Sequence, residues 1–209
     1  MVKIRTIKDT KNNSSGPGRK KIIDAFISLL EKREFDAITT AEIARIAGVR
    51  EALIYKYFDH KRDLLYQLLR EYLEQFRPQL ELDLMGINGA LNKIRRLFWT
   101  HIYAYSKNRV FSKLLFLEVR GFPDYYMSET YQLVKDYAKI FLNIIDEGVR
   151  SGEIRDDIPP RLIRQVLMGS IEHVCLRAII FDQEFSPDEL TENLCELLFK
   201  GIVKGKHRN

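Results

Sequence analysis

The 209-residue chain is poor in cysteine and histidine, and it lacks long apolar runs. Its two cysteines, Cys175 and Cys195, are too few for a disulfide framework and too far apart for a CxxC site, which favours a reducing cytoplasm. The four histidines form no HxxxH or HExxH pattern, and we expect neither a metal site nor a cofactor. Apolar runs reach four residues, as in Leu114 to Leu117, whereas a bilayer span needs about 20. We therefore expect no membrane segment. The N-terminus also lacks the apolar stretch of a secretory signal, so we expect no such signal.

Basic charge is concentrated near the beginning of the chain. Residues 1–64 contain 14 Lys and Arg against nine Asp and Glu, whereas residues 65–209 contain 20 of each, so the first third carries the whole excess of +5. Residues 1–18 are polar and end in a run of Asn, Ser, Gly and Pro, which predicts a flexible basic arm. A local positive field attracts polyanions, nucleic acid first and an acidic membrane surface second. A solvated tail without a partner is the alternative interpretation.

The periodicity of apolar residues predicts an all-α fold. Glycine and proline are sparse, at 11 and six residues, and no alternating β-branched stretch is long enough to argue a sheet. A first helix is expected from Lys20 to about Glu34, and Pro78 is expected to end a long helix that starts at His60. The further long helices are expected at about 87–107, 109–119, 125–151, 160–181 and 187–203.

Two short helices are expected between the first helix and His60. Thr39 and Glu42 form the pattern of a capping box, in which both side chains satisfy free backbone N–H groups at a helix start. Gly48 is expected to stop that helix, and a second one is expected from about Arg50 to Tyr57. Two helices joined by a tight glycine turn make a helix-turn-helix, which fits the major groove of DNA.

One face of the second short helix carries residue types that can read bases. Arginine can bind guanine, tyrosine and alanine can contact a thymine methyl group, and glutamate can accept from cytosine or orient the arginine. The predicted base-reading residues are Arg50, Glu51, Ala52 and Tyr55. Side chains and backbone N–H groups that can bind phosphate surround these residues. They lie at the N-terminus of the first short helix, at the far end of the reading helix and at the start of the next helix. The predicted phosphate contacts are Thr39, Thr40, Lys56, Tyr57 and Lys61.

These motifs resemble the signature of TetR-family transcriptional repressors over residues 20–66. The resemblance lies in Thr39-Thr40-Ala41-Glu42-Ile43-Ala44, Ala47-Gly48-Val49, Leu53-Ile54-Tyr55-Lys56-Tyr57-Phe58, Lys61 and Leu64. It implies an N-terminal three-helix domain that binds operator DNA as a homodimer, and a larger helical domain whose small effector releases the DNA. The expected division is a basic arm at 1–18, a DNA-binding domain at 19–64 and a ligand-binding and dimerisation domain at 65–209. Arg50 and Glu51 stand where many members carry a small residue, so the resemblance does not assign the operator sequence.

Aromatic residues are concentrated in the neutral part of the chain. Residues 98–141 contain 12 of the 23 aromatic side chains, which suits a helical pocket for an apolar ligand, although the same spacing is also typical of ordinary core. Arg120 is placed either at the pocket edge, where it would pair with an anionic head group, or in a surface ion pair. The predicted pocket residues are Phe98, Trp99, Tyr103, Phe111, Phe116, Arg120, Tyr137 and Phe141.

The C-terminal region is similar to the FadR-type branch of the family, which senses long-chain fatty acyl-CoA. The similarity lies in Phe116-Leu117-Glu118-Val119-Arg120, Asn143-Ile144-Ile145-Asp146-Glu147-Gly148 and Ser151-Gly152-Glu153-Ile154. It implies an acyl chain among the aromatic residues and a basic rim for the CoA phosphates. A fatty acyl-CoA is therefore the expected effector.

The last two helices carry wide apolar stripes. Two such helices from each subunit can pack as a four-helix bundle, or they can belong to the core of one chain. A dimer is favoured because one short reading helix spans too few base pairs for useful specificity. The predicted interface residues are Ile163, Val166, Leu167, Ile171, Leu190, Leu194 and Leu197.

Two other functions stay open at this point. An all-α enzyme with an incidental basic arm is disfavoured, because the sequence lacks a GxSxG motif and Glu172-His173 does not have the spacing of helical metal ligands. A general nucleic-acid or membrane-surface binder would depend on the basic arm alone. The leading hypothesis is a ligand-responsive transcriptional repressor.

Overall fold

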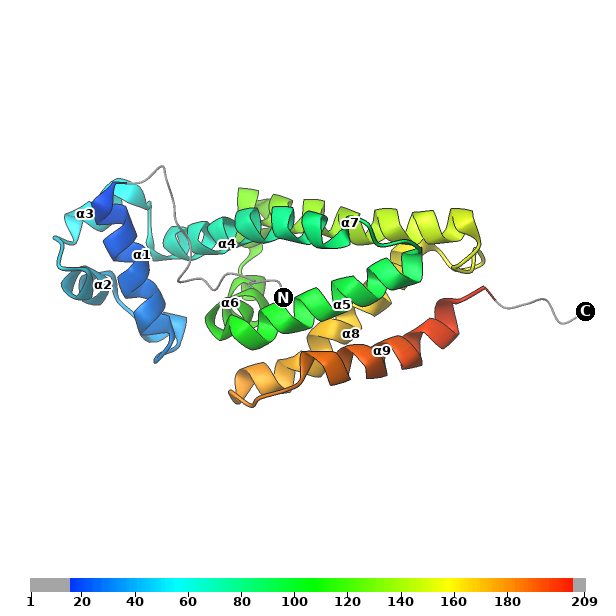
Figure 1. Cartoon of the computed structure of the whole chain (residues 1–209). Coiled ribbons are helices and arrows are strands. Elements are labelled where there is room, and N and C mark those ends of the chain that lie inside the picture. Colours follow the sequence, from blue (N-terminus) through cyan, green and yellow to red (C-terminus); the bar gives the residue numbers. More distant parts are fainter. Residues whose placement is uncertain (1–15, 205–209) are drawn as a thin grey trace, which may run out of the picture. The chain divides into compact units, whose positions relative to one another are not determined.

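The computed structural model describes residues 16–204, where the regular secondary structure is helical (Figure 1). The extended pairing found in this range is one isolated antiparallel bridge between Ile154 and Val203. These observations confirm the predicted all-α class. Among the described helices, none is both long and apolar enough to cross a bilayer. Most of the predicted basic arm, residues 1–15, lies outside the described residues.

Contacts divide the chain into two compact units. The first unit runs to Gln75 and also includes Val110–Leu133, and the second contains Phe76–Arg109 and the chain from Val134 onwards. This grouping by contacts differs from the functional division predicted at residue 64, because residues 110–133 join the N-terminal helices. The division at residue 64 into a DNA-binding domain and an effector-binding domain stays a prediction.

The first unit is built on α1 (Pro17–Leu30), η2 (Phe35–Ala37), α2 (Thr40–Ala47), α3 (Ala52–Tyr57) and the beginning of α4 (Lys61–Leu84). α1 starts three residues before the predicted Lys20, because proline is well suited to the first turn of a helix, where its missing N–H would have no partner. Apolar side chains of α1, α2, α3 and α4 and of the turn after α3 are buried in this unit. The fully buried members include Ile22, Phe26, Ile43, Ile54, Phe58 and Leu65.

The expectation that Pro78 ends α4 is wrong, because the helix continues to Leu84. Proline cannot donate to the carbonyl of Glu74, but the loss of one hydrogen bond does not break a helix whose next turn is well anchored. Leu80 is fully buried in the second unit. Two pairs of side chains four residues apart support the turn after the proline, namely Arg77 with Glu81 at 3.0 Å and Gln79 with Asp83 at 3.0 Å.

The single helix expected over residues 109–119 is divided into shorter pieces. α6 (Arg109–Lys113) leads into a π-helical turn, η3 (Leu114–Glu118), and then into the 3₁₀ turns η4 (Val119–Gly121) and η5 (Pro123–Met127). Leu114 and Val119 are both buried, although they lie five residues apart. A π-helical turn places residues five apart on one side of the helix, so it keeps both side chains in the core.

The second unit contains the rest of α4 and four longer helices, α5 (Ala90–Lys107), α7 (Glu129–Ser151), α8 (Pro160–Ile180) and α9 (Pro187–Ile202). α7 takes its first five residues from the first unit. Its Gly148 lies so close to Ala90 and Ile154 that an added Cβ would be 2.7 Å and 2.6 Å from their side-chain carbons. Glycine at this position therefore permits the close packing of α7 on the start of α5.

Candidate DNA-binding face and effector core

The helix-turn-helix forms as the sequence predicts. The Thr39 hydroxyl accepts from the backbone N–H of Glu42 at 3.2 Å, and Gly48 ends α2 in the left-handed conformation with φ of 65°. Only one half of the predicted capping box is present, because Arg33 donates to the carboxylate of Glu42 at 2.7 Å. The cap and the glycine turn fix where α3 begins and which of its faces is buried.

The predicted base-reading residues lie together on the outer face of α3 and on the turn before it. Arg50, Ala52 and Tyr55 are exposed, and the exposed fraction of Tyr55 is 54%. Glu51 is partly buried, and its carboxylate accepts from the Thr40 hydroxyl. Because Ile54 is fully buried on the opposite side, this face cannot turn inwards without exposing the core.

The predicted phosphate contacts have different environments. Thr39 and Thr40 lie at the start of α2, where backbone N–H groups and the helix dipole favour an anion. Lys56 is exposed and Tyr57 is partly buried at the end of α3. The Lys61 ammonium group donates to the backbone carbonyls of Phe35 at 2.9 Å and Ile38 at 2.8 Å, and burial lowers its pKa. Lys61 is therefore engaged within the chain.

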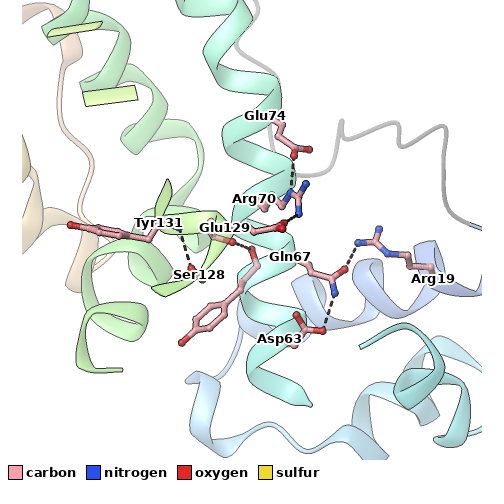
Figure 2. A network of polar contacts seen from close by, with 10 residues as sticks. Arg19, Asp63, Gln67, Arg70, Glu74, Ser128, Glu129 and Tyr131 are labelled. Atoms are coloured by element: carbon pink, nitrogen blue, oxygen red, sulfur yellow. Dashed lines mark hydrogen bonds and ion pairs between the residues drawn. The ribbon is translucent and has the colours of Figure 1, made fainter. Parts of the chain in front are cut away.

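A network of polar contacts joins α1 to the first half of α4 (Figure 2). Arg19 donates to Gln67 at 2.9 Å, and Gln67 donates in turn to Asp63 at 2.9 Å. Arg19 also forms an ion pair with Glu71, and both side chains of this pair are largely buried. A buried ion pair stabilises only while both partners are present, so loss of either Arg19 or Glu71 would leave the other charge buried and unpaired.

The opposite end of the same network involves the start of α7 (Figure 2). Arg70 pairs with Glu74 at 2.8 Å and with Glu129, and the Thr130 hydroxyl donates to the backbone carbonyl of Tyr66 at 3.0 Å. A polar pocket of about 630 Å³ lies at this junction. Within the first unit, α4 is therefore tied to α1 and to the first turn of α7.

A buried polar pair lies in the aromatic core of the second unit. The Nδ1 atom of His101 is 2.6 Å from the carbonyl of Leu97, and its Nε2 atom is 2.6 Å from the hydroxyl of Tyr137. A carbonyl can only accept, so Nδ1 carries the proton and the Tyr137 hydroxyl donates to Nε2. The rings of Phe76 and Phe141 lie 5.9 Å and 5.3 Å from the imidazole. Burial lowers the pKa of His101 to about 4.

The predicted pocket residues fall into separate groups. In the second unit Phe98, Tyr137 and Phe141 are buried, whereas Trp99 stacks on Tyr103 at 4.8 Å. The indole N–H of Trp99 donates to Asp188 at 2.6 Å, which directs it towards α9. The remaining three residues, Phe111, Phe116 and Arg120, belong to the first unit.

Sequence reasoning missed His101 and the network around Arg19. A lone histidine among the apolar residues of α5 is a signal that could have drawn attention to His101. No spacing rule connects Arg19 with Gln67, which is 48 residues away in the sequence. Only the packing of α1 on α4 brings these two side chains together.

The apolar stripes of α8 and α9 have a buried and an exposed side. Ile163, Leu167, Ile171 and Leu194 of the predicted interface set are buried within the single chain, and Leu190 is partly buried. Val166 and Leu197 are exposed, with exposed fractions of 50% and 71%. Leu162 and Val174 continue the exposed side of α8 at intervals of four and eight residues from Val166. We call Leu162, Val166, Val174 and Leu197 the exposed apolar face.

A capped helix, a left-handed glycine turn and a second helix with an exposed polar face define a helix-turn-helix DNA-binding regulator. Comparison with known families identifies it further. Residues 22–68 match bacterial regulatory proteins of the tetR family, and residues 69–201 match the C-terminal region of YsiA-like proteins. The chain belongs to the tetR family of bacterial regulatory proteins, which confirms the resemblance noted in the sequence.

Individual proteins that are similar to this chain are also transcriptional regulators. The chain is 28% identical to the fatty acid metabolism regulator protein of Bacillus subtilis over 89% of its own length and 96% of that protein. The crystal structure of the transcriptional regulator FadR from Bacillus subtilis in complex with stearoyl-CoA has a TM-score of 0.79, with 28% identity, over 88% of this chain and 98% of that one. The fatty acid degradation regulator FadR of Bacillus halodurans has a TM-score of 0.80 at 23% identity, over 90% and 98% of the two chains.

Proposed function

We propose that this regulator binds operator DNA as a homodimer through α3, and that a long-chain fatty acyl-CoA releases it from the DNA. The observation that carries the proposal is the exposed polar face of α3 on a chain that is similar, over most of its length, to a fatty acid metabolism regulator. DNA in bacteria lies in the cytoplasm, so the cytoplasm is the proposed site of action.

The DNA contacts follow from residue type and position. Arg50, Glu51, Ala52 and Tyr55 would meet base edges in the major groove. Phosphates on either side would be met by the start of α2, by the end of α3 and by the start of α4. The residues proposed for these phosphate contacts are Thr39, Thr40, Lys56, Tyr57 and Lys61. The DNA-binding domain would then comprise residues 19–64, with residues 65–209 for effector binding and dimerisation.

The effector proposal rests on chemistry as well as similarity. The FadR structure from Bacillus subtilis is a complex with stearoyl-CoA. In this chain the buried rings of Phe98, Tyr137 and Phe141 supply apolar surface of the kind that an acyl chain requires.

The dimer proposal uses the exposed apolar face. Four exposed apolar side chains, three on α8 and one on α9, are better explained by a protein partner than by contact with water. Because isologous interfaces place the same surface on both subunits, two copies of this face would build a four-helix contact. Two reading helices could then reach successive major grooves about 34–36 Å apart.

Selection of bound sequences from a random duplex library tests the DNA-binding proposal. We expect a two-fold symmetric site to be enriched, and Tyr55→Ala to change the preference among sequences. Deletion of residues 1–18 should weaken binding but leave selectivity in place. Equal weakening on all sequences by Tyr55→Ala, or loss of all selectivity on removal of the arm, would favour a general nucleic-acid binder.

A further inference from the structure

Three side chains on the helix-turn-helix form a hydrogen-bonded chain. Thr40 is the first residue of α2, and Glu51 and Tyr55 lie one helical turn apart on the reading face. The Thr40 Oγ1 atom is 2.5 Å from Glu51 Oε1 and 3.2 Å from the phenol oxygen of Tyr55. One hydroxyl group therefore contacts two of the four residues proposed to read bases.

The direction of both hydrogen bonds follows from the chemistry of the groups. A carboxylate has no hydrogen to give, so Thr40 donates its only hydroxyl hydrogen to Glu51. Thr40 then has only lone pairs to offer to Tyr55, and Tyr55 must be the donor in the second bond. The hydroxyl hydrogens of Thr40 and Tyr55 are therefore both used in hydrogen bonds within the protein.

The exposed side of this group can consequently only accept hydrogen bonds. The Tyr55 phenol oxygen has a lone pair left, its side chain is more than half exposed, and the carboxylate of Glu51 also only accepts. In the major groove the donors are the amino groups of adenine N6 and cytosine N4, whereas guanine and thymine present acceptors at the corresponding place. Each base pair presents one amino group in the major groove, from adenine or from cytosine. A surface that only accepts hydrogen bonds therefore selects the strand on which that base lies.

We propose that Thr40 is a positioning residue for specificity. Thr40 donates its hydroxyl hydrogen to Glu51 and accepts that of Tyr55. Tyr55 and Glu51 then present only acceptors to the DNA, and this surface prefers adenine or cytosine over guanine or thymine on the contacted strand. The proposal rests on the proposed role of α3 in reading bases. A phosphate contact by Thr40 would then use its backbone N–H, because its hydroxyl hydrogen belongs to Glu51.

The full chain offers a matched pair of variants for the test. Thr40→Val keeps the shape of the side chain and removes the hydroxyl that bonds Glu51 and Tyr55. Thr40→Ser restores a hydroxyl. Tyr55→Phe identifies the operator position that the phenol contacts, because preference at that position should weaken. The measurement is relative affinity for the four bases at that position.

Wild type and Thr40→Ser should prefer adenine and cytosine over guanine and thymine at this position by about fivefold, as expected for one hydrogen bond. Thr40→Val should bring the ratio close to one, because Tyr55 can then donate as well as accept. The double variant Thr40→Val/Tyr55→Phe should show no further loss.

An unchanged ratio in Thr40→Val would overturn the proposal, and so would a wild-type preference for guanine or thymine. These results differ from failure of the proposed function, in which no position in the DNA would respond to Tyr55→Phe at all.

Discussion

The buried pair of His101 and Tyr137 predicts a specific acid sensitivity of the fold. The ordinary pKa of histidine is 6.5, and burial lowers that of His101 to about 4. Between these values the unfolded chain binds a proton that the folded chain refuses, so stability falls as the pH falls from about 6.5 to about 4. At 1.36 kcal/mol per pKa unit, the contribution lost is about 2 kcal/mol at about pH 5 and approaches about 3 kcal/mol near pH 4.

Urea unfolding as a function of pH measures this loss. Carboxylates also titrate in acid, so the informative quantity is the difference between wild type and the double variant His101→Phe/Tyr137→Phe. Replacing both partners leaves no unpaired buried group. The double variant should lack about 2 kcal/mol of the loss between about pH 7.5 and pH 5, whereas His173→Asn, on an exposed position of α8, should keep it. Identical pH profiles for wild type and the double variant would refute the argument.

Substitutions at Arg19, Lys61 and Leu197 test other parts of the molecule. Arg19→Met leaves the buried carboxylate of Glu71 unpaired and should lower the free energy of unfolding by about 3 kcal/mol. Arg19→Met/Glu71→Leu should recover most of that loss in the same urea titration. Lys61→Ala should lower the melting temperature because carbonyls of Phe35 and Ile38 lose their donor, and the salt slope of DNA binding should fall by about one if Lys61 also meets a phosphate. Leu197→Glu should convert a dimer to a monomer in light scattering, and Met127→Glu, at an exposed position of the first unit, should not.

Local rules were sufficient for the helix-turn-helix. The Thr39 cap, the Gly48 turn and the apolar positions around Ile54 are short-range signals, and each one is present in the structure as expected. Pro78 does not end the helix, because the rule for proline considers one lost hydrogen bond and not the burial of Leu80 two residues later. The turn at Leu114–Glu118 was also missed, since a five-residue spacing of buried side chains is rarely helical.

The aromatic core of the second unit was harder to predict from sequence. The ring side chains of α5 point in different directions, with His101 towards Tyr137 on α7 and Trp99 towards Asp188 on α9. Helical spacing shows that both positions are near the core, but it does not say which neighbouring helix each one meets. The link between Arg19 and Glu71 depends on tertiary packing for the same reason.

Release of DNA by the effector is the most direct test of the account. The measurement is fluorescence anisotropy of a selected operator duplex bound to the full chain, titrated with stearoyl-CoA and, separately, with free CoA. The account predicts that stearoyl-CoA dissociates the complex at concentrations at which free CoA does not. Binding of stearoyl-CoA to the protein with no change in its affinity for the operator would contradict it.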